Sequence, residues 1–173
     1  MPDQWGLSSL VAAFWDNLSP QFAGSDGIYV YNDSERHAFV IEWSRLPNYE
    51  LVPHGQDDFI TTEDYQTFQM LLRDPAHYPT TTGDGEIVFQ YKQVVNDDYT
   101  LMYSTVGIED HTENVGLLYT YSNDYADGAA PLSPGLAIKF TTEAPEYQPL
   151  VPLYFTAARG RGVELRWAFR AND

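Results

Sequence analysis

Two acidic residues in the segment TGDGEIVFQY, residues 82–91, are of types that do chemistry. The carboxylates of Asp84 and Glu86 could act as an acid–base pair, or they could bind Ca²⁺, which takes about six to eight oxygen ligands. Residues two apart share one face of an extended strand, so these two carboxylates could converge. Gly85 between them instead favours a turn that leads into a strand. We therefore expect an architectural role first, with Asp84 and Glu86 as candidate ligands of a structural calcium ion.

Other sequence patterns typical of catalysis do not occur in the chain. It has no Cys, which excludes disulfides, thiolate metal sites and Cys nucleophiles. The four His are far apart and form no HExxH motif, and neither a GxSxG nor an SxxK serine motif is present. The acidic loops at 96–99 and 122–128 also offer oxygen ligands for Ca²⁺ but lack the spacing of an EF-hand loop. We expect a protein that is not an enzyme.

Aromatic residues are abundant, and exposed rings can stack on sugar rings. The chain has 13 Tyr, 9 Phe and 4 Trp. Tyr suits half-exposed positions, and the candidate ligand-binding tyrosines are Tyr99, Tyr119, Tyr121 and Tyr125. Large aromatics also dominate the cores of sheets, and the residues expected there are Trp15, Phe39, Trp43 and Phe89.

The segments that must position these residues have the pattern of β-strands. GIYVYN (27–32) and HAFVIEW (37–43) are rich in aromatic and β-branched residues, and the polar DSER between them indicates a hairpin. In the second segment Phe39 and Trp43 fall on one face and Glu42 on the other, which is the period of two expected in a sheet.

Further short runs complete this pattern, at 86–94, 104–110, 116–123 and 136–142. The segment YQTFQMLLRD (65–74) alternates like a strand, although the preceding TTED could cap a short helix; we favour the strand. Short strands bounded by Asn, Asp, Gly or Pro predict an all-β fold, an antiparallel β-sandwich of jelly-roll-like or immunoglobulin-like type.

The composition changes near the end of the chain, where TEAPEYQPLVP is rich in acids and Pro. We expect a sandwich module in residues 1–146 and a linker plus a hairpin in 147–173. The hairpin resembles the first one of a fibronectin type III domain, with Trp167 as its inward-facing aromatic; a hairpin appended to the sandwich is the alternative. An isolated hairpin is marginal in water, so these strands should pair with the sandwich or with a neighbouring chain, which could form a homo-oligomer.

Charge excludes two classes of partner. Lys plus Arg is 9 against 25 Asp plus Glu, a net charge of −16, which repels nucleic acids and anionic membranes. No window has the roughly 20 apolar residues of a membrane span, and the N-terminus lacks the pattern of a signal peptide. We expect neither nucleic-acid binding nor membrane insertion.

The order of several motifs resembles a known family. LVAAFWDNLSP, GSDGIYVYN, HAFVIEWSRLPNY, YQTFQMLLRD, GDGEIVFQYKQV and STVGIED follow one another. This order is similar to that of the nidogen-type (NIDO-like) extracellular domain, over about residues 10–110. DPAHYPTTTGDGEIVFQYK and APLSPGLAIKFTT extend a resemblance to β-rich accessory modules of secreted multidomain bacterial proteins with type IX secretion signals. The resemblance implies an extracellular module without a known catalytic centre, secreted or on the bacterial cell surface.

These observations together predict a non-catalytic module of a larger secreted or cell-surface protein. Its expected role is adhesion, binding of an extracellular protein or glycan, or support of a neighbouring domain of the same polypeptide. One alternative is a carbohydrate-binding module. Another is a self-assembling subunit of a surface layer or filament.

Overall fold

The computed structural model describes residues 8–22, 24–51, 59–96, 104–143, 152–159 and 163–169. Of residues 50, 51, 59–64, 152–159 and 163–169 it describes the backbone only. The chain divides into two compact units, Met1–Thr142 and Glu143–Asp173, and each is considered by itself. The expected ligand residue Tyr99 lies outside the described residues.

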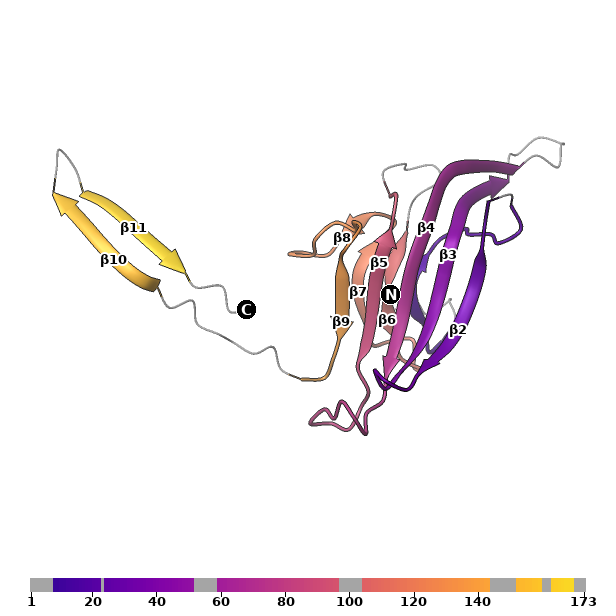
Figure 1. Ribbon diagram of the computed structural model, residues 1–173, viewed down its shortest axis with the longest axis horizontal. Coiled ribbons are helices and arrows are strands. Elements are labelled where there is room, and N and C mark those ends of the chain that lie inside the picture. Colours follow the sequence, from indigo (N-terminus) through magenta and orange to yellow (C-terminus); the bar gives the residue numbers. More distant parts are fainter. Residues whose placement is uncertain are drawn as a thin grey trace. The chain divides into compact units, whose positions relative to one another are not determined.

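The first unit is built from strands, as Figure 1 shows. Their bounds are β1 Val11–Trp15, β2 Gly27–Asp33, β3 Ala38–Leu51, β4 Phe59–Arg73, β5 Ile87–Gln93, β6 Thr105–Glu109, β7 Gly116–Tyr121, β8 Asp124–Tyr125 and β9 Ala137–Phe140. The segment 65–74 lies mostly in β4, so the strand prediction is confirmed and the helix alternative is wrong. None of the described residues forms a helix that could span a membrane.

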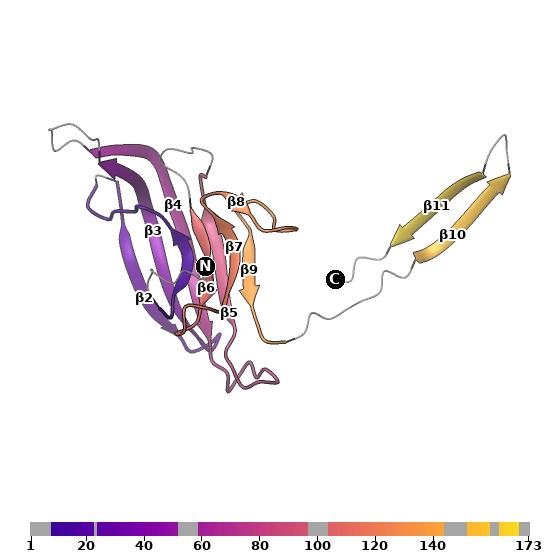
Figure 2. The ribbon, with the colours of Figure 1, turned by 180° about the vertical axis from the view of Figure 1, so that it is seen from behind.

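Two antiparallel sheets pack against each other, which confirms the predicted β-sandwich. The larger sheet has the strand order β2-β3-β4-β5-β9, and the smaller has the order β1-β6-β7-β8. Figure 2, seen from behind, shows the smaller sheet in front of the larger one. The predicted hairpin of 27–32 and 37–43 is present as β2 and β3, which pair in a continuous register from Gly27 opposite Ser44 to Asp33 opposite Ala38.

The core lies between the sheets and is rich in aromatic side chains. Phe89 is fully buried, as predicted, and Trp43 is half-buried and stacks on Phe68 with ring centroids 4.9 Å apart. The prediction was wrong for Trp15 and Phe39, whose side chains are 47% and 42% exposed. Trp15 is the last residue of β1 and directly follows Phe14, which belongs to the core, and Phe39 is the second residue of β3.

A hydrogen bond crosses the core from one sheet to the other. The hydroxyl of Tyr91 in β5 donates to the backbone carbonyl of Ala13 in β1, at 2.6 Å. Burial raises the pKa of this hydroxyl, so it stays protonated and remains a donor. The bond satisfies the one polar atom of an otherwise apolar side chain in the core.

A second buried polar group ties β3, β4 and the end of β5 together. The side-chain amide nitrogen of Gln66 donates to Asn48 Oδ1 at 2.8 Å and to the carbonyl of Val95 at 2.9 Å. Its oxygen accepts from the Val95 N–H at 2.9 Å. Asn48 in turn donates to Asp16 Oδ2 at 2.8 Å. Gln66 and Asn48 are fully buried, so these bonds replace water for groups that could not otherwise be satisfied.

The second unit contains an antiparallel pair of strands, β10 Pro152–Arg159 and β11 Val163–Phe169. Its register places Phe155 opposite Trp167 and Ala157 opposite Leu165. The hairpin strands predicted within 147–173 are therefore present, while residues 160–162 between them lie outside the described residues.

Candidate ligand-binding face

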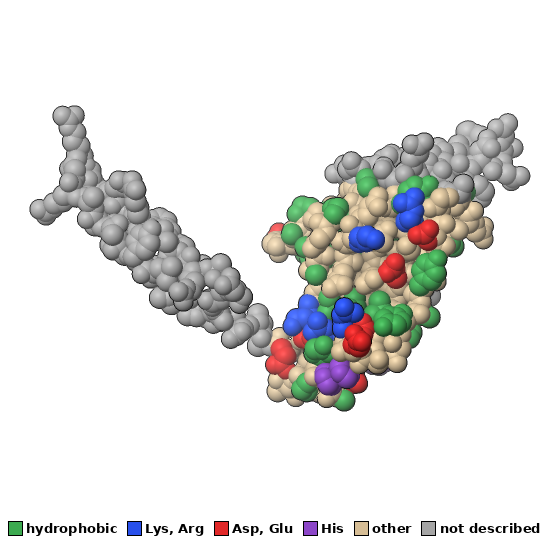
Figure 3. Space-filling model, in the orientation of Figure 1, with side chains coloured by type: hydrophobic (Ala, Val, Ile, Leu, Met, Phe, Trp, Pro, Cys, Tyr) green, Lys and Arg blue, Asp and Glu red, His purple; other side chains and the backbone are tan. Residues whose placement is uncertain are grey.

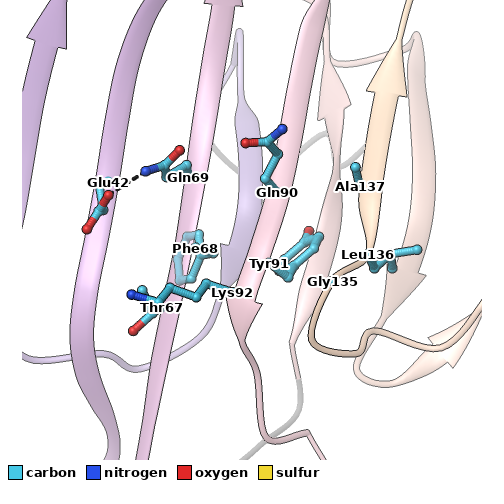
Figure 4. A pocket seen from close by; sticks show the side chains of 10 residues that line it. All are labelled: Glu42, Thr67, Phe68, Gln69, Gln90, Tyr91, Lys92, Gly135, Leu136 and Ala137. Carbon is cyan, nitrogen blue, oxygen red and sulfur yellow. Dashed lines mark hydrogen bonds between the residues drawn. The ribbon is translucent and has the colours of Figure 1, made fainter.

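One side chain from each strand of the larger sheet lines up across its outer face. Because Met70 and Phe89 belong to the core, strand alternation puts Gln69 and Gln90 on the opposite face. The pairing register then aligns a cross-strand row of Tyr29, Glu42, Gln69, Gln90 and Ala137. In this row the side-chain amide of Gln69 donates a hydrogen bond to the Glu42 carboxylate, as the dashed line in Figure 4 shows.

Two adjoining hollows in this face share Gln69 and Gln90 in their walls. Their volumes are about 390 Å³ and about 420 Å³. The side chains that line the first include Glu42, Thr67, Lys92 and Ala137, and those that line the second include Val40, Leu71, Arg73 and Tyr78. Figure 4 shows the first hollow, with the amides of Gln69 and Gln90 on neighbouring strands. The two hollows therefore form one shallow surface across the strands.

A second row, beside the first, is apolar. The register aligns Tyr31 with Val40, Leu71 and Val88, and the row ends at Lys139 in β9. Val40 and Val88 are buried, while Tyr31 is 58% exposed and Tyr29 in the first row is 55% exposed. The face thus offers amide and carboxylate groups beside an apolar strip, with two exposed Tyr rings on the edge strand β2.

Charged side chains close one end of this face, and they neutralise one another. The carboxylate of Glu86 accepts from Arg73 at 3.1 Å and from Lys139 at 2.8 Å, and the side chain is only 9% exposed. The hydrogen bond from Lys139 is the main reason that the pKa of Glu86 lies below its usual value. In Figure 3 acidic and basic side chains lie next to one another towards this end of the first unit.

The turn between β2 and β3 adds a second neutral pair to the same end. Arg36 donates to the Asp33 carboxylate at 2.7 Å, and this bond holds the pKa of Asp33 below its usual value. The hydroxyl of Tyr78 donates to the Arg36 carbonyl at 3.1 Å, and the guanidinium of Arg73 lies 4.4 Å from the centre of the Tyr78 ring. These contacts hold the loop 74–85 against the sheet.

The candidate calcium ligands Asp84 and Glu86 have different surroundings. Asp84 is exposed, whereas Glu86 is buried between two cations. A Cβ at Gly85 would lie 2.9 Å from the Arg73 carbonyl oxygen, and the Arg73 N–H donates to the Glu86 carbonyl at 3.0 Å. This close approach supports the architectural role expected for the segment. Among the described residues no three His, Asp or Glu side chains are grouped as a metal site.

The candidate tyrosines of the smaller sheet do not form a common surface. Tyr119 and Tyr125 pack edge to face, 6.2 Å apart. The Tyr119 hydroxyl donates to the Ala130 carbonyl, and the Tyr125 hydroxyl accepts from Asn96 and from the Leu132 N–H. Both therefore hold loops in place. Tyr121 is 62% exposed.

The residues of the cross-strand row were not singled out from the sequence. Strand alternation correctly places Glu42 opposite Trp43, but it cannot say which side chains of other strands lie beside Glu42. The signal that could have found them is that strand alternation puts a Gln on the outward-facing side of two strands, Gln69 and Gln90. Only the register of β4 and β5 makes them neighbours.

The chain was compared with known protein families, proteins and structures. No family model, curated protein or solved structure matches the chain.

Proposed function

We propose that this chain is a non-catalytic module that binds a glycan on the outer face of its five-stranded sheet. The observation that carries the proposal is the cross-strand row, in which Glu42, Gln69 and Gln90 lie side by side on an open surface. A glycan chain laid along this row would cross the strands.

The chemistry of the row suits sugar hydroxyls. An amide offers both donors and an acceptor, and a carboxylate accepts two or more hydrogen bonds. Sugars also present apolar C–H faces, which stack on aromatic rings such as those of Tyr29 and Tyr31. A concave surface with an apolar floor and a few polar groups is the usual form of a small-molecule site.

Charge favours a neutral glycan over an acidic one. The chain as a whole carries a net charge of −16, so an anionic ligand would be repelled on approach. Of the cations near the hollows, Arg73 and Lys139 are paired with Glu86 and Arg36 is paired with Asp33. Lys92 lines the first hollow together with Glu42, which carries the opposite charge. A ligand without charge requires no further compensation at this face.

The same pairs support a binding role without catalysis. Hydrolysis of a glycoside uses two carboxyl groups, one of them protonated because its pKa is raised. On this face the pKa values of Glu86 and Asp33 are lowered instead, so both stay ionised near neutral pH. Glu42 is held in a hydrogen bond with Gln69.

An extracellular location is part of the proposal. It rests on the resemblance of residues 10–143 to nidogen-type and bacterial accessory modules. In that setting the module would hold a larger secreted or cell-surface protein, with its neighbouring domains, on a glycan-bearing surface.

Affinity electrophoresis against a panel of polysaccharides tests this function. We expect neutral polymers such as glucans, xylans or mannans to retard the protein, and acidic ones such as polygalacturonate to have no effect. The control is Tyr121→Ala. It removes from the smaller sheet a Tyr that is about as exposed as Tyr29 and Tyr31, and it should leave the retardation unchanged. Retardation by no neutral polymer in the panel would count against the proposal.

A further inference from the structure

Three of the four edge strands in the described part of the first unit carry features that discourage pairing with another chain. The edges of its two sheets are β1 and β8 in one, and β2 and β9 in the other. The β1 strand has a shift in register between Ala12 and Trp15, β8 has two residues, and β9 has four residues including Lys139. Irregular register, short length and an edge Lys are the usual means of blocking edge-to-edge association.

The fourth edge strand, β2, has none of these features. It has seven residues and pairs with β3 in an unbroken register. Its sequence GIYVYND contains neither Lys nor Pro. Among the described residues only β3 pairs with it, so alternate backbone N–H and C=O groups along β2 point away from the sheet.

Both faces of β2 expose large apolar side chains. Ile28 and Val30 are 53% and 66% exposed on the inner side, and Tyr29 and Tyr31 are 55% and 58% exposed on the outer side. A long, regular and apolar edge of this kind is what a second strand requires as a template.

We propose that the β2 edge binds the β2 edge of a second copy of this chain, antiparallel and about a two-fold axis near Val30. The two larger sheets would then join into one continuous sheet. This surface differs from the C-terminal strands, for which the sequence predicts pairing with the sandwich or with a neighbouring chain.

Charge singles out a second copy as the partner. Two chains of net charge −16 repel each other. Residues 27–32 contain no charged side chain, and the acid that ends the strand, Asp33, is paired with Arg36. The β2 edge is therefore a segment along which two copies can meet without bringing like charges together.

The strand is also complementary to itself. Val30 is the middle residue of Gly27–Asp33, so a two-fold axis there places Val30 opposite Val30 and Tyr29 opposite Tyr31. Cross-strand pairs of aromatic and β-branched residues stabilise antiparallel sheets. Because the contact is one strand wide, and stable interfaces bury roughly 1,200 Å² or more, we expect a weak, reversible dimer.

Such a dimer has a consequence for the binding face, and this part rests on the proposed function. A two-fold axis perpendicular to the sheet keeps both outer faces on the same side. Tyr29 and Tyr31 of the two copies would meet at the centre, between two cross-strand rows. One polysaccharide chain could then contact both copies, which increases avidity.

Sedimentation equilibrium of the full chain, from low micromolar to near-millimolar concentration, tests the dimer without any ligand. We expect the wild-type protein to dimerise reversibly and Val30→Lys to remain monomeric. The matched control is Val115→Lys, since Val115 is 64% exposed against 66% for Val30 and lies outside β2. This control should dimerise like the wild type. A wild-type protein that is monomeric throughout, or a Val30→Lys variant that dimerises as strongly as the wild type, would overturn the inference.

A crosslinking experiment covers the case in which Val30→Lys alters the fold. The chain has no Cys, so a single introduced Cys reports on one position. Val30→Cys should form a disulfide-linked dimer under mild oxidation, because residues opposite each other across a two-fold axis bring their Cβ atoms within about 5.5 Å. Val115→Cys should form far less disulfide-linked dimer than Val30→Cys. Equal crosslinking of the two variants would contradict pairing through β2.

Discussion

The side-chain amide of Gln69 donates a hydrogen bond to the carboxylate of Glu42, from one strand to the next, on a face that is open to solvent. The bond fixes the orientation of both side chains before any ligand arrives. Groups held in this way lose less conformational entropy on binding than free ones do. The row that contains them is therefore prepared for a ligand that crosses β3, β4 and β5.

Glu86 should make folding stability depend on acid pH. Its usual pKa is 4.5, and the bond from Lys139 lowers the pKa in the folded state. The unfolded chain therefore takes up the proton first as the pH falls. The stabilisation is present above pH 4.5 and is lost as the pH falls through the lower folded value.

Urea unfolding from pH 7 to pH 3 compares the wild type with Glu86→Gln. At pH 7 the variant should be less stable by about 1 kcal/mol, since Arg73 and Lys139 are both partly exposed and water screens their charges. The difference should shrink as the pH falls below 4.5. A difference that stays constant with pH would show that the carboxylate charge contributes nothing.

The buried amide of Gln66 should matter far more for stability than the exposed amide of Gln90 on the binding face. Gln66→Leu leaves Asn48 and both backbone groups of Val95 without these partners. We expect a loss on the order of 3 kcal/mol in the free energy of unfolding. Gln90→Leu, at an exposed position, should change it by less than about 0.5 kcal/mol. Similar effects of the two substitutions in chemical denaturation would contradict the role of the buried network.

Calcium should not stabilise the fold through Asp84 and Glu86. Both oxygens of Glu86 already accept hydrogen bonds from cationic side chains, so a metal ion would have to displace them. Thermal melting with EDTA and with added CaCl₂ should give the same Tm. A calcium-dependent rise in Tm that Asp84→Asn abolishes would show that the segment is a metal site after all.

Much of the fold follows from local sequence patterns. The alternation in 27–32 and 37–43 predicts both strands and their hairpin, because the period of two and the polar turn are local properties. The acidic segment 82–91 is likewise correctly read as a turn before a strand, and the close approach of Gly85 to the Arg73 carbonyl shows why glycine is needed there.

Long-range pairing is the part that the sequence does not reveal. Trp15 and Phe39 have the residue types of a core, but their burial depends on which residues of distant strands pack against them. Gln69 and Gln90 become neighbours only through the register of β4 and β5. The abundance of Tyr suggested ligand-binding tyrosines that lie in the smaller sheet, where Tyr119 and Tyr125 instead support loops.

The most direct test of the binding face is NMR titration of the side-chain amides with the neutral oligosaccharide that corresponds to the retarding polymer. Gln69 and Gln90 should show the largest shifts among the glutamine side chains, while the buried Gln66 should not shift. The double variant Gln69→Ala/Gln90→Ala should lose at least tenfold in affinity, which is about 1.4 kcal/mol, and keep its fold. Shifts confined to the other sheet, or full affinity in the double variant, would contradict the account.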